Sequence, residues 1–361
     1  MKGNTMKYFL QFCRIAVACL FIFSGVIKLN DPVGTQIKME EYFEVFGTHF
    51  MVPFALYVAV LMCVAEVALG FALLFFYRMK YTASLLLALI VFFTFLTFYS
   101  AFFNKVTDCG CFGDFIKLKP WTSFSKDIIL TVLILPLFIH RNQLSAGYNN
   151  TKGDIIVVTG TLLSYAFAMY CIMHLSVWDF RAYKVGANIP QLMQPSCAAQ
   201  YKYTMLKNGN EETFDKYPSD TTYQFKDMVL TNPECMPKIT DYSFWNDEGD
   251  FTQHSFSGKR LFIIMLNVDG ASTSHLNEIK ILIQNLSHTD IVPSVITASD
   301  KAKYEIFSEK NELNIPYYFA DGVVIKTMIR SNPGLMYLDN GVVKGKWHHN
   351  DVPVIEDLLK L

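Results

Sequence analysis

The sequence predicts a helical membrane bundle followed by a soluble α/β domain. Hydrophobic residues make up 52% of the 361 positions and charged residues only 17%, which is too apolar for an ordinary soluble protein. The bias is concentrated in the first half, and from about Asp179 onward the composition becomes ordinary and polar. This change in composition indicates a membrane half and a soluble half.

Five apolar segments are long enough to cross a bilayer as helices. They cover approximately residues 8–29, 52–77, 82–103, 124–139 and 155–177. The first lacks a small-residue cleavage site and is followed by more apolar segments, so we expect an uncleaved membrane helix and not a secretory signal. The first four define a four-helix membrane domain over residues 1–145, and a fifth membrane helix follows at 153–178. Residues 35–46, between the first two segments, are expected to form an amphipathic stretch at the membrane surface.

Five crossings place the two termini on opposite sides of the membrane. Basic residues at the N-terminus and in the second and fourth loops favour a cytoplasmic position for these parts: Lys2, Lys7, Arg78, Lys80, Arg141 and Lys152. The third loop and the C-terminal half then face the periplasm of a bacterial inner membrane, although that loop also contains several lysines. This orientation places the four cysteines outside the apolar segments in one oxidising compartment: Cys109, Cys111, Cys197 and Cys235.

Residues 179–250 are expected to form a β-rich connecting region on the periplasmic side. Residues 201–206 and 211–217 predict a hairpin around Asn208-Gly209, and residues 221–230 predict a further strand. Cys197 and Cys235 flank this region, and a disulfide between them would staple it, although the sequence does not fix the pairing.

Residues 251–361 have the pattern of an α/β domain with a central mixed sheet. Strands are expected at 261–268, 291–297 and 317–319, and helices at 274–286, 301–312, 323–329 and 352–359. A hairpin at 335–338 and 342–347 is expected over Asp339-Asn340-Gly341.

The loop Asp108–Asp114 is the candidate for chemistry because it presents Cys109 and Cys111 two residues apart. A disulfide in so tight a ring is strained and readily reduced, which suits a catalyst of thiol–disulfide exchange. Gly110 and Gly113 supply the backbone freedom that the turn needs. A structural disulfide is the alternative. No metal site is expected, because two sulfurs with Asp108 and Asp114 make an incomplete ligand set.

Three charged residues within the apolar segments could support this loop. Lys28 is expected near the outer face, where snorkelling to the interface is the favoured interpretation and stabilisation of a thiolate is the alternative. Arg14 and Glu66 are expected to form an ion pair between the first two membrane helices, because an unpaired charge there is costly. A proton relay through Glu66 is the alternative. The phenylalanines of the third segment could hold a quinone, but such rings more often pack against neighbours or lipid.

The membrane half resembles the DoxX/MauE superfamily. The resemblance rests on Arg14, the string Phe21–Leu29, Glu66, Gly70 and the string Asp108–Gly113 (Asp-Cys-Gly-Cys-Phe-Gly). It implies a four-helix membrane bundle and, for some members, disulfide formation, thiosulfate oxidation or respiratory electron transfer. MauE-like members are thought to handle periplasmic thiols. The whole arrangement is similar to DoxX-family proteins of Bacteroidetes.

The C-terminal domain resembles thioredoxin. Ser331–Gly341 is similar to the loop in which a cis-proline, here Pro333, precedes a hairpin strand. Thioredoxins carry Cys-x-x-Cys at the first strand-to-helix junction, whereas the matching segment here, Asp269–His275, contains no cysteine. The resemblance therefore implies a redox-dead module that binds or positions a partner.

Two hypotheses remain. In the first, the protein is an inner-membrane thiol–disulfide redox protein, in which Cys109 and Cys111 take electrons from a periplasmic thiol protein and pass them toward a quinone. In the second, it is a non-enzymatic membrane scaffold whose C-terminal domain recruits partners and whose Cys-x-Cys loop is structural. Membrane lipid is the expected surrounding in both. Nucleic-acid binding has little support, because the net charge is −1 and no basic run is present.

Overall fold

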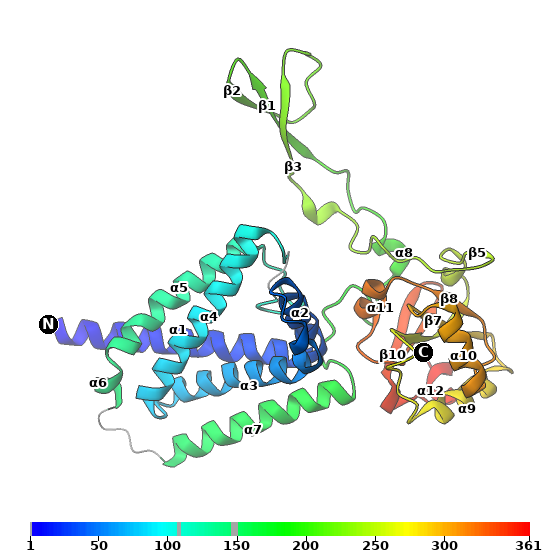
Figure 1. Cartoon of the computed structure of the whole chain (residues 1–361), viewed down its shortest axis with the longest axis horizontal. Helices are drawn as coiled ribbons and strands as arrows, with labels where there is room; N and C mark the ends of the chain where they lie inside the picture. The colour runs from blue at the N-terminus through cyan, green and yellow to red at the C-terminus, as the bar shows by residue number, and fades with distance from the viewer. Residues whose placement is uncertain (1, 107–109, 146–150) are drawn as a thin grey trace. The chain divides into compact units, whose positions relative to one another are not determined.

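The computed structural model describes residues 2–106, 110–145 and 151–361. The chain divides into two compact units, Met1–Phe180 and Arg181–Leu361. Figure 1 shows the first as a set of helices and the second as strands with shorter helices. The predicted fold class, a helical membrane bundle followed by an α/β domain, is confirmed.

Within the described residues of the first unit, five helices are long and apolar enough to cross a membrane. They are α1 (Lys2–Asn30), α3 (Ala55–Leu74), α4 (Met79–Phe103), α5 (Pro120–Ile139) and α7 (Thr151–Met173). A 3₁₀ turn, η1 (His49–Phe54), leads into α3, and the short α6 (Arg141–Ser145) follows α5. All five predicted segments therefore correspond to helices, with ends that differ by a few residues.

The amphipathic stretch after α1 is the helix α2 (Pro32–Val45). Asp31 caps it, because its side chain accepts a hydrogen bond of 2.9 Å from the Gly34 amide, and Pro32 occupies the first turn, where no donor is lost. One face of α2 packs on α3 and α4 through Met39 and Tyr42. The Tyr42 hydroxyl lies 2.9 Å from the Ser100 hydroxyl of α4.

Two glycines bring α1 and α3 into close contact. A Cβ atom at Gly25 would lie 2.5 Å from Val67 Cγ2, and one at Gly70 would lie 2.6 Å from Ile22 Cγ1. Small residues allow helix backbones to approach closely in membranes. The contacts also fix the register of the two antiparallel helices, because they place residue 25 of α1 beside residue 67 of α3.

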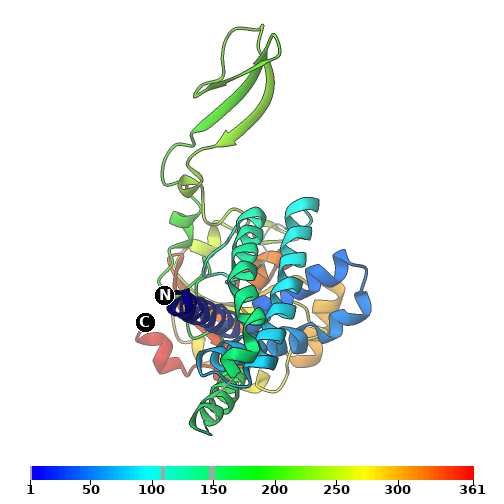
Figure 2. The same ribbon diagram turned by 90° about the vertical axis from the view of Figure 1, so that its left-hand side faces the viewer.

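The second unit contains two sheets, and the smaller one has three antiparallel strands in the order β2-β1-β3. The strands are β1 (Tyr201–Lys207), β2 (Asn210–Phe214) and β3 (Gln224–Leu230). Figures 1 and 2 both show them as a separate, twisted ribbon. Asn208 and Gly209 both have positive φ, as the predicted two-residue hairpin turn requires. The short helix α8 (Ile189–Leu192) precedes this sheet.

The larger sheet has seven strands in the order β10-β9-β6-β7-β8-β4-β5. Three central strands are parallel: β6 (Lys259–Met265), β7 (Ile291–Thr297) and β8 (Tyr317–Phe319). The antiparallel strands are β9 (Gly334–Asp339) and β10 (Val342–His348) on one side and β4 (Trp245–Asn246) and β5 (Gly249–Asp250) on the other. The helices are α9 (Leu276–Leu286), α10 (Lys301–Asn311), α11 (Gly322–Met328) and α12 (Ile355–Leu359).

This sheet begins earlier in the chain than the boundary expected at residue 251. Strand β4 pairs with β8 through Trp245 and Phe319, so the end of the connecting region belongs to the sheet. The start of that region also contacts it, because the Gly186 amide donates to the Val343 carbonyl at 2.8 Å. The Asn332–Pro333 bond is cis, as predicted.

Candidate functional site

A buried ion pair joins the C-terminal part of α1 to the middle of α3. The Lys28 ammonium contacts the Glu66 carboxylate, and the two side chains are only 6% and 2% exposed. The Ser24 hydroxyl lies 3.1 Å from Glu66 Oε2 and 3.0 Å from the backbone carbonyl of Cys111. A serine hydroxyl has one hydrogen, so Ser24 donates to one of these oxygens at a time. It thereby connects the ion pair to the cysteine loop.

The predicted ion pair between Arg14 and Glu66 is wrong. The helix register places Glu66 beside residues 24–28 of α1, and residue 14 lies about 16 Å further along that helix at 1.5 Å per residue. Arg14 instead donates to the backbone carbonyls of Leu73 and Leu74 at the end of α3 and covers the Phe76 ring at 4.0 Å. It satisfies carbonyls that the helix end leaves without partners.

The favoured interpretation of Lys28 was also wrong. Its side chain does not reach the surface, because only 5% of the residue is exposed. Its ammonium lies 5.2 Å from the centre of the Phe93 ring. The alternative, an ammonium near the thiol loop, agrees with the structure, since Lys28 and Cys111 line the same pocket.

A second charged pair, which the sequence analysis missed, lies at the start of α5. Asp127 is fully buried, receives a hydrogen bond of 2.9 Å from the Thr97 hydroxyl of α4, and contacts the ammonium of Lys126. The Lys126 ammonium also lies 5.5 Å from the centre of the Phe112 ring. The sequence does contain a signal for this pair, because Asp127 is a carboxylate inside an apolar segment. A charge there is energetically costly and usually functional.

One member of each charged pair, Lys28 and Lys126, lines an open pocket. Helices α1, α2, α3, α4 and α5 all contribute to its wall, and Cys111 lies at its rim with Gly110. Three lysines line it: Lys28, Lys38 and Lys126. Glu66 and Asp127, the other members of the two pairs, line a smaller adjoining pocket. The two pockets share Ser24, Phe93 and Lys126.

The loop after Cys111 is anchored to α1. The rings of Phe112 and Phe115 lie 5.9 and 5.7 Å from the ring of Phe23. Gly110 and Gly113 both have positive φ, which confirms the predicted need for glycine in the turn. The Asp114 carboxylate lies 3.6 Å from the Lys117 ammonium. The other two predicted residues of the loop, Asp108 and Cys109, lie outside the described residues.

Most of the α4 phenylalanines point away from the protein interior. The exposed ones are Phe92, Phe95, Phe98, Phe102 and Phe103. Phe93 differs, because it lines both pockets. Among the α4 phenylalanines that suggested a quinone site, Phe93 is the one that lines the pockets beside the charged pairs.

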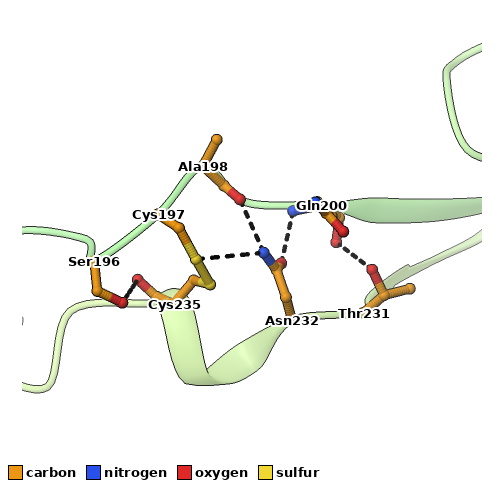
Figure 3. The surroundings of a disulfide bond; sticks show 7 residues. All are labelled: Ser196, Cys197, Ala198, Gln200, Thr231, Asn232 and Cys235. Atoms are coloured by element: carbon orange, nitrogen blue, oxygen red, sulfur yellow. Dashed lines mark hydrogen bonds between the residues drawn. A yellow bond between two sulfur atoms is a disulfide. The ribbon is translucent and has the colours of Figure 1, made fainter.

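In the second unit, Cys197 and Cys235 form the predicted disulfide (Figure 3). The Asn232 side chain links the segment before β3 to the segment before β1. Its amide nitrogen donates to the Ala198 carbonyl at 2.9 Å, and its oxygen accepts from the Gln200 amide at 2.7 Å. The disulfide and these hydrogen bonds close the base of the three-stranded sheet. This arrangement indicates a structural role.

Hydrogen bonds join the cis-proline loop to the junction between β6 and α9. The Asn332 side chain donates to the Asn267 carbonyl at 2.8 Å and accepts from the Leu266 amide at 3.0 Å. The Ser272 amide donates to the Asn332 carbonyl at 2.9 Å. The junction itself contains Ser272, Ser274 and His275 but no cysteine.

A histidine from the end of β10 approaches this junction. His349 Nδ1 lies 2.9 Å from the Ser331 hydroxyl, and its ring is 6.2 Å from that of His275. The Ser331 hydroxyl donates to the Pro333 carbonyl at 2.6 Å, so we infer that His349 Nδ1 carries the proton and donates to Ser331. Burial, and secondly the nearby His275, lower the pKa of His349 below its ordinary value.

The fold and the site define a helical membrane protein with a thiol-bearing loop above buried charges. Residues 6–140 match the family model described as "Methylamine utilisation protein MauE". This range contains every residue of the two charged pairs and the whole cysteine loop.

A curated relative gives a second comparison. Protein TlpB of Flavobacterium psychrophilum is 27% identical over 177 residues, which is 48% of this chain and 46% of that protein. The chain thus spans about half the length of the relative.

Proposed function

We propose that the protein is a membrane thiol–disulfide oxidoreductase whose reactive pair is Cys109 and Cys111. The observation that carries the proposal is that Cys111 lines the same pocket as Lys28 and Lys126, one member of each of the two charged pairs. Ionisable groups inside a membrane are costly and usually mark a function. Here the ammonium groups of Lys28 and Lys126 share a pocket with the Cys111 thiol.

The two ammonium groups give this thiol a chemical role. A thiolate is the attacking species in disulfide exchange, and a nearby cation stabilises it. Lys28 and Lys126 supply that charge, and Ser24 holds the Cys111 backbone against the first pair. We propose that these residues position and activate the cysteine and that they do not themselves react.

The proposed reaction oxidises a protein dithiol. A thiolate of the substrate attacks the Cys109–Cys111 disulfide and forms a mixed disulfide, which the second substrate thiol resolves. The substrate leaves with a new disulfide, and the pair on the loop keeps two electrons and two protons as two thiols. A quinone held beside Cys111 by Lys28 and Lys126 would supply the oxidant that re-forms the loop disulfide, since it would accept both electrons and both protons.

The C-terminal domain is proposed to be thioredoxin-like and to hold the substrate. Its parallel strands β6, β7 and β8, its antiparallel strands β9 and β10 and its cis-proline loop support this assignment. Because its junction Asp269–His275 lacks cysteines, it would present a thiol protein and not exchange with it. We place the domain in the periplasm and the bundle in the inner membrane of a bacterium.

Thiol trapping in intact cells tests the proposal. We expect wild type to show both oxidised and reduced loops, and Cys109→Ser or Cys111→Ser to accumulate a mixed disulfide with a second protein. Cys19→Ser is the matched control, because Cys19 lies on the exposed face of α1 outside the pocket and should change nothing. A loop that stays oxidised under reducing stress, with no mixed disulfide in either variant, would favour the scaffold hypothesis.

A further inference from the structure

The pocket beside Cys111 has the lining of a binding site for a small molecule with acceptor oxygens. Its described lining residues include three lysines and the hydroxyls of Ser24, Thr35, Tyr42 and Thr97, but no carboxylate. Glu66 and Asp127 line the adjoining pocket instead. The lysine of each ion pair thus faces this pocket, whereas the carboxylate of each pair faces the adjoining one. Ammonium and hydroxyl donors of this kind stabilise an oxygen acceptor.

Several of the polar side chains that line this pocket are largely buried. Lys28 is 5% exposed, Thr97 is 2% exposed, and the Lys126 side chain is 26% exposed. Charged donors that are largely buried among protein atoms bind an acceptor more strongly than exposed donors do. The ion pairs hold Lys28 and Lys126 in fixed positions before any ligand arrives.

The remaining wall is apolar and deep. Met39, Met62, Phe93 and Leu96 complete it. Phe93 lies ten residues before the end of α4, which is about 15 Å along the helix from its outer end at 1.5 Å per residue. A ligand in this pocket therefore meets both charged donors and the hydrocarbon level of the bilayer, so it must combine polar oxygens with an apolar body.

We propose that this pocket binds the ring of a quinone. A quinone ring is flat and apolar and carries two carbonyl oxygens, which accept hydrogen bonds from Lys28 and Lys126, while Phe93 and the methionines contact its faces and edge. This inference rests on the proposed function, because it supplies the oxidant of the dithiol and places it beside Cys111. The loop loses two electrons and two protons and gains a sulfur–sulfur bond, and the quinone becomes a quinol.

Binding can be measured without the redox reaction. The probe is ubiquinone-1, titrated calorimetrically into the full chain carrying Cys109→Ser and Cys111→Ser, which cannot exchange disulfides. We expect this form to bind the probe, and Lys126→Met to weaken binding about tenfold or more, because a charged donor is lost. Lys126→Arg should restore much of the affinity. Lys117→Met is the matched control, because that lysine is 71% exposed and does not line the pocket.

A second measurement does not depend on the folding of a variant. Photolabelling of wild type with an azidoquinone should modify Phe93–Thr97 or Gly110–Lys126. Absence of binding, unchanged affinity in Lys126→Met, or labelling confined to the exposed rings of α4 would overturn the assignment. Displacement of the probe by millimolar thiosulfate or sulfate would also overturn it, because the pocket would then be a site for inorganic anions. In each case the thiol-trapping result stands by itself, so a wrong pocket and a wrong function are distinguishable.

Discussion

Removing one partner of the Lys28–Glu66 pair should destabilise the bundle strongly. In Glu66→Gln, the Lys28 ammonium remains 5% exposed but has lost its carboxylate. Breaking a buried ion pair in this way costs about 3–5 kcal/mol, because the remaining charge is left without compensation. Lys28→Met leaves the Glu66 carboxylate with the Ser24 hydroxyl and should cost a similar amount.

The double variant Lys28→Met/Glu66→Gln separates charge from packing. It leaves no uncompensated charge, so we expect it to lose less free energy of unfolding than either single variant. Lys38→Met is the control, because the side chains of the Lys38–Glu41 pair are 25% and 40% exposed and such pairs contribute about 1 kcal/mol or less.

The assay is unfolding of the full chain in a mild detergent by titration with a denaturing detergent, followed by circular dichroism. The free energies of unfolding of wild type, the two single variants and the double variant form a cycle that isolates the interaction. The reasoning is refuted if Glu66→Gln is no less stable than Lys38→Met. It is also refuted if the losses of the two single variants simply add in the double variant.

Three further outcomes follow from the described contacts. Cys197→Ser should destabilise the three-stranded sheet by about 3–4 kcal/mol, since the disulfide closes a separation of 38 residues, and faster proteolysis between residues 198 and 234 would show it. Gly25→Ala should lower the stability of the bundle by about 1–3 kcal/mol, because the new Cβ meets the stiff Val67 side chain, and a thermal melt in detergent measures this. The domain that contains His349 should lose stability as the pH falls below 6.5. The pKa of His349 is lower in the folded chain than in the unfolded chain, so the unfolded chain binds the proton more readily. Hydrogen exchange of β9 and β10 between about pH 7 and 5 should show this loss, and His349→Gln should reduce it.

The sequence predicted the elements of both units because their signals are local. Membrane helices follow from hydropathy over about 20 residues. The hairpin of β1 and β2 follows from Asn208-Gly209, whose positive φ values the turn demands. The cysteine loop was equally visible, since two thiols and two glycines lie within five residues.

Pairings between distant elements could not be predicted in the same way. Hydropathy gives the depth of a residue in its own helix but neither the register nor the rotation of one helix against another. The error with Arg14 and Glu66 arose there, because the close contacts at Gly25 and Gly70 decide which residues face each other. Strand β4 escaped prediction for a related reason, since it has two residues and its pairing of Trp245 with Phe319 spans a long stretch of chain.

The candidate site combines both kinds of information, which explains why only half of it was found. Its thiols occupy one short loop, but its charges come from α1, α3 and α5, and Ser24 and Thr97 orient them. Serine and threonine at these positions carry no signal in a sequence, because both residues commonly bond to the backbone of their own helix. Here each also reaches a buried carboxylate on another helix, and the Thr97 hydroxyl lies as well within bonding distance of the Phe93 and Thr94 carbonyls of its own helix. A substitution at either position should therefore affect thiol chemistry through the charged pairs, although neither residue would be chosen from sequence.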